Sequence, residues 1–364
     1  MILPITIDLV TRSRYNTTLP LTLQSILNQS QLPTKILVYD DTPNKIDMRT
    51  VPLYQYIINN TIKMGIEFEV VFGTCKGQVV GHQLAIDKSN TDFIYRIDDD
   101  EIMPYNLLEK LYEDMMSDPM NGAIAPLVHD PNTRNIPTVT QNPDEFVNKI
   151  TEILYTQNFQ WIMPADRTVK YKAEHLFSSF LFDRKKCNGY CTELSQVGHR
   201  EETIFSHDIL RKGFKLVIDP SVIVQHYKNP EGGIRDKNVT NEMFQKDEET
   251  FKRKLISWNI QIDKKKIIIL NCGIGDHFAF KNHVKGLIEN IPDITIASAF
   301  PNIFFDIPNI KIMGLQPAYD VLGKTEAESH NIYTWCIKRE WKPENGNLVE
   351  MYRRFLNETF NIAL

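Results

Sequence analysis

The sequence predicts an α/β protein: a mostly parallel sheet flanked by helices, followed by a second, smaller α/β domain. Two observations support this prediction. Short β-branched runs alternate with segments of helical period through the first hundred residues, and the same alternation starts again near residue 265. The chain has 364 residues, which is long for one compact domain, so two domains are expected.

The N-terminal elements are predicted from apolar runs that end in turn residues. Strands joined through helices pair in parallel with right-handed crossovers, and ligands bind at the carboxyl ends of such strands. Polar or acidic clusters follow three of the predicted strands, at 11–14, 40–41 and 98–100. We predict strands at 4–10, 35–39, 67–72 and 93–97, and helices at 19–27, 54–63 and 77–87.

Composition excludes some classes of function. A net charge of −5 argues against broad affinity for nucleic acids or anionic membranes. No apolar stretch is long enough to span a bilayer, and the N-terminus reads as a first strand, not a signal peptide. The five cysteines are an odd number scattered over a long chain, which predicts reduced thiols and a cytoplasmic protein.

The segment FIYRIDDDEIMP, at 93–104, places four carboxylates directly after a predicted strand. Such crowding is explained by a divalent cation, because Mg²⁺ and Mn²⁺ take oxygen ligands. The alternative is a solvated acidic turn that caps the helix starting near Pro104. The motif alone does not separate these two interpretations.

Four pieces in order resemble the nucleotide-sugar-binding GT-A domain of family 2 glycosyltransferases, over residues 1–227. They are ITIDLVTRSR with LPLTLQSILNQS, KILVYDDTP, GHQLAIDKSNTDFIYRIDDDE, and HREETIFSHDILRKGFKLVIDPSVIVQHY. Together they correspond to the opening strand and helix, the second strand with its paired aspartates, the D-x-D motif, and the later acidic motif with a terminal histidine. The resemblance covers about three-fifths of the chain.

The resemblance implies roles for individual residues. Asp40 and Asp41 would lie beside uracil and ribose, and Asp98 would contact the ribose or a metal-bound water. Asp100 and His226 would ligate Mn²⁺ or Mg²⁺, which stabilises the departing diphosphate. We assign the wider nucleotide-binding set to Thr11, Arg12, Arg14, Asp40, Asp41, Asp98 and Asp99.

The same resemblance places the catalytic base at Glu202. An inverting transfer needs a carboxylate that takes the proton of the acceptor hydroxyl. The family usually carries Glu-Asp before a helix, and this chain carries Glu201-Glu202, with Gly213 suited to the helix end. Asp208 is the alternative base. Both glutamates also suit a helix N-terminus without any catalytic role.

Two further departures concern the substrates. The family often has Arg-Asn before the D-x-D strand, where this chain has His82-Gln83, so the diphosphate would rely on Arg12, Arg14, Lys76 or the basic run 184–186. The acceptor site is expected between the acidic run and Glu202. Of Tyr155, Phe159 and Trp161 in that stretch, we select Trp161 as an acceptor contact.

The remaining chain is predicted as a linker with an amphipathic helix (228–264) and a small Rossmann-like domain (265–364). The turn GIGDH at 273–277 resembles the opening of a GT-B domain, and its amides could bind a phosphate. A packing, oligomerisation or acceptor-docking role is the preferred interpretation of this domain. The oligomeric state itself stays open.

The sequence therefore predicts a metal-dependent, inverting glycosyltransferase that moves a sugar from a UDP-linked donor to a hydroxyl acceptor such as a surface glycan. Protein, lipid and modified bases of phage DNA remain alternative acceptors. A nucleotidyltransferase is disfavoured because TRSRYNTT contains no glycine to form a phosphate loop. A non-catalytic nucleotide-sugar-binding protein is the other alternative.

Overall fold

The chain forms two compact units in a computed structural model. The first comprises the described residues of Met1–Ile150 and Asn158–Gln261, and the second those of Thr151–Gln157 and Ile262–Leu364. The structure describes residues 2–44, 46–131, 138–153, 159–233, 240–261, 266–292, 294–308, 310–316, 318, 328–339 and 347–364.

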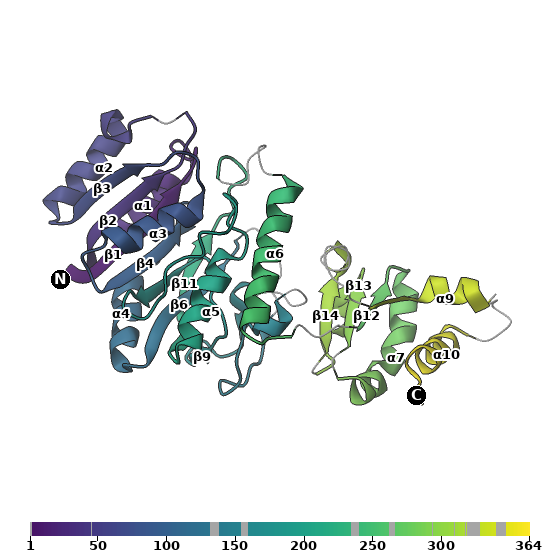
Figure 1. Ribbon diagram of the computed structural model, residues 1–364. Coiled ribbons are helices and arrows are strands. Elements are labelled where there is room, and N and C mark those ends of the chain that lie inside the picture. Colours follow the sequence, from purple (N-terminus) through teal and green to yellow (C-terminus); the bar gives the residue numbers. More distant parts are fainter. Residues whose placement is uncertain are drawn as a thin grey trace. The chain divides into compact units, whose positions relative to one another are not determined.

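The first unit is built on a nine-stranded sheet (Figure 1). Its strand order is β3-β2-β1-β4-β10-β6-β11-β5, and β9 pairs with β11. The strands are β1 (Ile2–Thr11), β2 (Leu32–Asp40), β3 (Glu67–Phe72), β4 (Phe93–Asp98), β5 (Glu101–Ile102), β6 (Asn121–His129), β9 (Tyr171–Lys172), β10 (Phe180–Asp183) and β11 (Lys215–His226). A separate pair is formed by β7 (Thr138–Val139) and β8 (Met163–Pro164).

The predicted parallel sheet is confirmed for the N-terminal half, where β3, β2, β1 and β4 are all parallel neighbours. Beyond β4 the sheet is mixed. Strand β10 runs antiparallel between β4 and β6, while β6 and β11 are parallel. The interiors of β1 and β2 are almost entirely buried, which explains why their sequences read as continuous apolar runs.

Helices of the first unit join and cover these strands. Helix α3 packs on β1 and β2, α4 on β6 and β11, and α5 on β6 and β11. The helices are α1 (Leu19–Leu27), α2 (Pro52–Lys63), α3 (Gln78–Lys88), α4 (Leu107–Ser117), α5 (Glu201–Arg211) and α6 (Asn241–Ser257). Single 3₁₀ turns lie at Met48–Thr50, Ile150–Glu152 and Phe159–Trp161. The helices predicted at 19–27, 54–63 and 77–87 are confirmed.

The second unit contains a four-stranded parallel sheet in the order β14-β13-β12-β15. Its core includes Phe280, Phe304, Tyr352 and Phe355, all at most 1% exposed. This confirms the smaller C-terminal α/β domain. Its elements are β12 (Lys266–Leu270), α7 (Ile274–Asn290), β13 (Thr295–Ser298), a 3₁₀ turn at Pro301–Phe304, β14 (Lys311–Gly314), β15 (Glu328–Asn331), α9 (Ile332–Arg339) and α10 (Leu348–Phe360).

The segment predicted as a linker contains an ordered helix of the first unit. Helix α6, expected at 240–258, groups with the first unit by its contacts. Residues 234–239 and 262–265 of the same segment lie outside the described residues. In the described part of the chain, no helix is long and apolar enough to cross a membrane. All five cysteines carry free thiols.

Candidate active site

The ends of three neighbouring strands bring the predicted residues together. In the register of the sheet, Thr11 of β1 lies beside Asp40 of β2, and Val10 lies beside Asp98 of β4. A cavity of about 500 Å³ opens at this edge. The predicted site residues that line it are Thr11, Arg12, Arg14, Asp41, Asp98, Asp99, Asp100, Trp161, Glu202 and His226.

Arg14 lies against the acidic run. Its Nη1 is 2.8 Å from Asp99 Oδ1 and 2.7 Å from Asp100 Oδ2, and all three side chains are largely buried. The Thr11 hydroxyl donates a 2.7 Å hydrogen bond to Asp99 Oδ2. Burial, partly offset by Arg14, raises the pKa of Asp99 to about 7. A guanidinium from the loop after β1 therefore balances part of the carboxylate charge.

Asp100 and His226 form a second charged pair. His226 Nε2 lies 3.3 Å from Asp100 Oδ1, and the Asn229 amide donates a 2.9 Å hydrogen bond to Asp100 Oδ2. Burial alone would raise the pKa of Asp100, but the His226 contact and Arg14 outweigh it and lower the pKa to about 2. Burial opposes the charge on His226, yet the facing carboxylates raise its pKa to about 9.

A candidate metal centre consists of Asp98, Glu101 and His226. One ligand atom from each lies within 4.8 Å of the others. Glu101 is fully buried, and Ser178 Oγ donates a 2.6 Å hydrogen bond to its Oε1. The short strand β5 pairs with the end of β11, which sets Glu101 opposite His226. The sequence prediction missed Glu101, although it continues the same acidic run.

A network of buried polar side chains contacts the residues of this centre. The Arg96 guanidinium, 1% exposed, donates to Glu201 Oε1 and to the Ser178 carbonyl, and its Nη2 lies 3.5 Å from Asp98 Oδ1. Its Nε donates to His82 Nε2 at 3.3 Å. Sequence reasoning did not select Arg96. A lone arginine inside the apolar run FIYRI is the signal that would have found it.

His82 takes part in the same network. Because its Nε2 accepts from Arg96, its Nδ1 donates to Asp8 Oδ2, and these two atoms are 2.8 Å apart. His82 and Asp8 are both fully or almost fully buried. His82 of α3 thus links β1 and β4.

Glu202 lies in the first turn of α5 and lines the cavity. Among the described residues, its carboxylate accepts no hydrogen bond. Its neighbour Glu201 does not line the cavity and is fully buried against Arg96. Asp208, the alternative base, does not line the cavity, and burial raises its pKa.

Trp161 forms a wall of the cavity beside His226. The two rings stack with centroids 5.5 Å apart and an interplanar angle of 29°, and Lys228 Nζ lies 3.9 Å from the centroid of the indole. Phe159 is buried against Tyr171. Tyr155 lies outside the described residues.

The paired aspartates of β2 differ in their surroundings. Asp40 is fully buried, accepts hydrogen bonds from the Tyr15 hydroxyl and the Thr42 amide, and does not line the cavity. Asp41 lines the cavity and accepts from the amides of Lys76 (3.2 Å) and Gly77 (2.8 Å). Neither Lys76 nor the basic run 184–186 lines the cavity.

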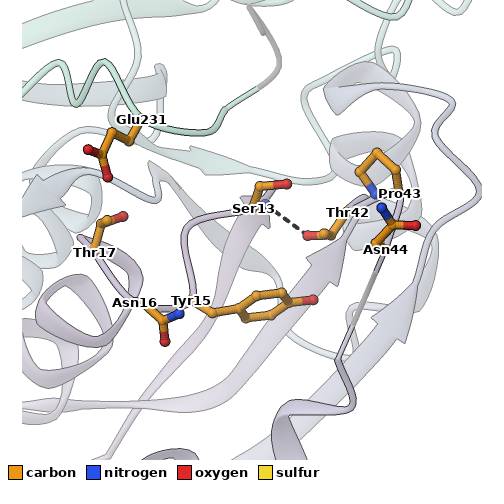
Figure 2. A pocket seen from close by; sticks show the side chains of 8 residues that line it. All are labelled: Ser13, Tyr15, Asn16, Thr17, Thr42, Pro43, Asn44 and Glu231. Carbon is orange, nitrogen blue, oxygen red and sulfur yellow. Dashed lines mark hydrogen bonds between the residues drawn. The ribbon is translucent and has the colours of Figure 1, made fainter.

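A smaller cavity of about 350 Å³ lies between the loop after β1 and the segment after β2 (Figure 2). The Ser13 amide donates a 2.8 Å hydrogen bond to Thr42 Oγ1, which joins the two segments. Tyr15, which holds Asp40, forms part of its wall. Its lining residues are Ser13, Tyr15, Asn16, Thr17, Thr42, Pro43, Asn44 and Glu231.

Comparison with known proteins gives one family match, in the N-terminal part of the chain. Residues 9–179 match the family model of glycosyl transferase family 2. The chain has no match among the curated proteins. Glu202 and His226 lie beyond the matched residues, so their place in the cavity comes from the structure alone.

Solved structures give weaker similarity. GalNAc-T7, crystallised with UDP, GalNAc and Mn²⁺, is 13% identical with a TM-score of 0.49, over 92% of this chain and 56% of that one. S. aureus TarS 1–349 in complex with UDP-GlcNAc is 12% identical with a TM-score of 0.48, over 67% of this chain and 64% of that one. The chain thus spans little more than half the length of GalNAc-T7.

The family match covers the end of β1 together with β2 and β4, and the loop and acidic run that follow β1 and β4 line the cavity. Residues 9–179, which match glycosyl transferase family 2, thus include the acidic run at one edge of the cavity.

Proposed function

We propose that the chain transfers a sugar, with inversion, from a UDP-linked donor to a hydroxyl acceptor in a reaction that depends on a divalent metal. One observation carries this proposal. A single cavity at the carboxyl edge of the sheet gathers an acidic cluster, cationic side chains and a carboxylate at the start of a helix. Leaving-group stabilisation and proton removal need these groups together.

The nucleotide subsite is proposed around the ends of β1, β2 and β4. Asp41 and Asp98 would accept hydrogen bonds from the base and ribose, and the Thr11 hydroxyl and Arg12 lie on the same wall. Asp40 would not contact the nucleotide itself but would position Tyr15 and Thr42, because its carboxylate accepts hydrogen bonds from both. Arg14, held between Asp99 and Asp100, would supply positive charge near the diphosphate.

The donor set at the acidic run fits Mn²⁺ or Mg²⁺. Two carboxylates and an imidazole, from Asp98, Glu101 and His226, are close enough to share one ion, and Asp100 adjoins His226. His226 Nδ1 is buried and makes no hydrogen bond within the described residues. When bound, the ion would supply Lewis-acid stabilisation of the diphosphate leaving group.

Glu202 is proposed as the base. The acceptor oxygen forms a bond to the anomeric carbon, the bond from that carbon to the diphosphate oxygen breaks, and the acceptor proton passes to the Glu202 carboxylate. Trp161 with Lys228 lies on the same cavity wall as His226 and would contact the acceptor. The reaction is proposed to take place in the cytoplasm, as the odd number of scattered cysteines predicts.

The test uses water as the acceptor, so the natural acceptor need not be known. UDP release from UDP-glucose, UDP-galactose and UDP-N-acetylglucosamine is measured with Mn²⁺ for the wild type, Glu202→Gln and Glu249→Gln. Glu249 is an exposed carboxylate on α6 and serves as the matched control.

We expect Glu202→Gln to lower kcat by about 100-fold or more, because general-base catalysis contributes that much. UDP affinity and the Glu249→Gln activity should stay within about twofold of wild type. Unchanged turnover in Glu202→Gln would remove Glu202 as the base, and no UDP release from any donor would reject the UDP-sugar assignment.

A further inference from the structure

Helix α6 carries a buried carboxylate that the site described above does not use. Asp247 is 0% exposed. Its Oδ1 accepts a hydrogen bond from the Ser195 amide at 2.5 Å, and its Oδ2 accepts from the Ser195 hydroxyl and the His199 amide, each at 2.8 Å. Burying a charge is costly unless several donors satisfy it. Here one short loop supplies all three donors.

That loop, residues 195–200, is a wall of the cavity and leads directly into α5. Gly198, His199 and Arg200 line the cavity together with Glu202. Arg200 begins the helix with φ +74°, a left-handed conformation that is unfavourable for a side chain other than glycine. A conformation of this kind persists only when surrounding contacts hold it.

Helix α6 adds a second contact beside the first. Glu248, the next residue, lies 3.4 Å from His199 Nε2 and 3.2 Å from Arg200 Nε. Burial alone would raise the pKa of Glu248, but these two partners lower it to about 2. Two consecutive carboxylates of α6 therefore bind Ser195, His199 and Arg200 of the loop.

On its other side, the loop packs closely against the start of α3. A Cβ placed on Gly77, at the start of α3, would lie 2.2 Å from the Gln196 carbonyl oxygen. The Gly77 amide is itself bound to Asp41, a residue of the proposed nucleotide subsite. The loop is thus wedged between α3, which borders the nucleotide subsite, and α6.

We propose that Asp247 is a positioning residue of the transfer reaction: it fixes the loop 195–200 so that α5 starts at Arg200 and Glu202 faces the cavity. This inference rests on the proposed function and extends it to a helix outside the family 2 match. In this arrangement α6 holds the loop that forms part of the cavity wall, and the three hydrogen bonds of Asp247 set the position of the base.

The test compares Asp247→Asn with Glu249→Gln, the same kind of change at an exposed position of the same helix. Ser195→Ala is the milder variant, because it removes only one of the three donors. The measurements are amide hydrogen exchange over 195–203, UDP affinity by calorimetry, and the pH profile of UDP release from the best UDP-sugar donor.

For Asp247→Asn we expect faster exchange at the Ser195 and His199 amides, kcat about tenfold lower, and UDP affinity within about twofold of wild type. The acid limb of the pH profile of kcat reports the pKa of the base. It should shift, because Glu202 would lie in changed surroundings. Ser195→Ala should lower kcat about two- to threefold, and Glu249→Gln should change nothing.

Three results would overturn the proposal: wild-type kcat in Asp247→Asn, unchanged exchange at residues 195–199, or an equal fall in kcat and UDP affinity at every pH. The last result is that of a purely structural residue. If Glu202→Gln is inactive while Asp247→Asn is normal, only the positioning role fails. If the wild type neither binds UDP nor releases it from a donor, the proposed function fails first.

Discussion

Arg14 lies between Asp99 and Asp100, two carboxylates of the acidic run for which the sequence predicts a divalent cation. Charge crowding in the run is therefore relieved by two means at the residue scale. The guanidinium pairs with Asp99 and Asp100, whereas Asp98, Glu101 and His226 converge on a separate point. A cation there would neutralise carboxylates that Arg14 does not reach.

Another buried residue, His175, gives a prediction about pH. Burial lowers the pKa of His175 from its usual 6.5 to about 3. As pH falls, the unfolded chain therefore takes up this proton before the folded one. The neutral His175 thus makes its full contribution to stability above pH 6.5, and this contribution declines toward pH 3. Between pH 7 and pH 5 this single group should cost about 2 kcal/mol of unfolding free energy.

Urea denaturation of the wild type and of His175→Gln at both pH values checks this. Glutamine cannot titrate, so the variant should lose about 2 kcal/mol less than the wild type on going from pH 7 to pH 5. Equal losses in the two proteins would show that His175 does not resist protonation in the fold.

At the element scale, the start of α3 is the tightest junction of the site. Gly77 has φ +94° and no room for a Cβ, whereas Gly213, after α5, has φ +90° with open space around it. Both glycines have a positive φ, which L side chains rarely adopt, and at Gly77 a Cβ would also meet backbone atoms. This makes the two positions a useful comparison.

Gly213→Ala should cost about 1 kcal/mol of stability, from backbone strain alone. Gly77→Ala should cost about 3 kcal/mol or more, because the new methyl group meets the Gln196 backbone. Urea denaturation measures both variants. Similar losses would mean that the loop 195–200 yields easily, which would also weaken the positioning role of Asp247.

The elements themselves could largely be predicted from sequence, for local reasons. Strand β1 and helix α1 follow from apolar period and turn residues within their own segments. The register that puts Thr11 beside Asp40 and Val10 beside Asp98 follows from parallel pairing of consecutive units. That is why Thr11, Asp41 and Asp98 could be placed at one edge without a structure.

The partners that complete the site could not be predicted, because they depend on contacts between distant segments. Arg96 meets Glu201, 105 residues away, and Asp247 meets Ser195 through a helix that follows residues predicted as a linker. Glu101 becomes a ligand candidate only because β5 pairs with the end of β11. Nothing in the local pattern around these residues specifies such pairings.

At the scale of the whole molecule, the proposed site lies within the first unit. Every residue that lines the larger cavity belongs to Met1–Ile150 or Asn158–Gln261. The second unit has its own parallel sheet and core. Nucleotide and metal binding should therefore depend on side chains of the first unit.

The measurement that tests the central claim most directly is calorimetric titration of UDP into the whole chain, with Mn²⁺ and with EDTA. It is repeated with Asp98→Ala and with Asp92→Ala, whose exposed carboxylate lies just before the same strand. We expect binding by the wild type and Asp92→Ala that EDTA weakens at least tenfold, and no such metal dependence in Asp98→Ala. Binding of equal strength with EDTA in all three proteins would contradict a metal site at the acidic run.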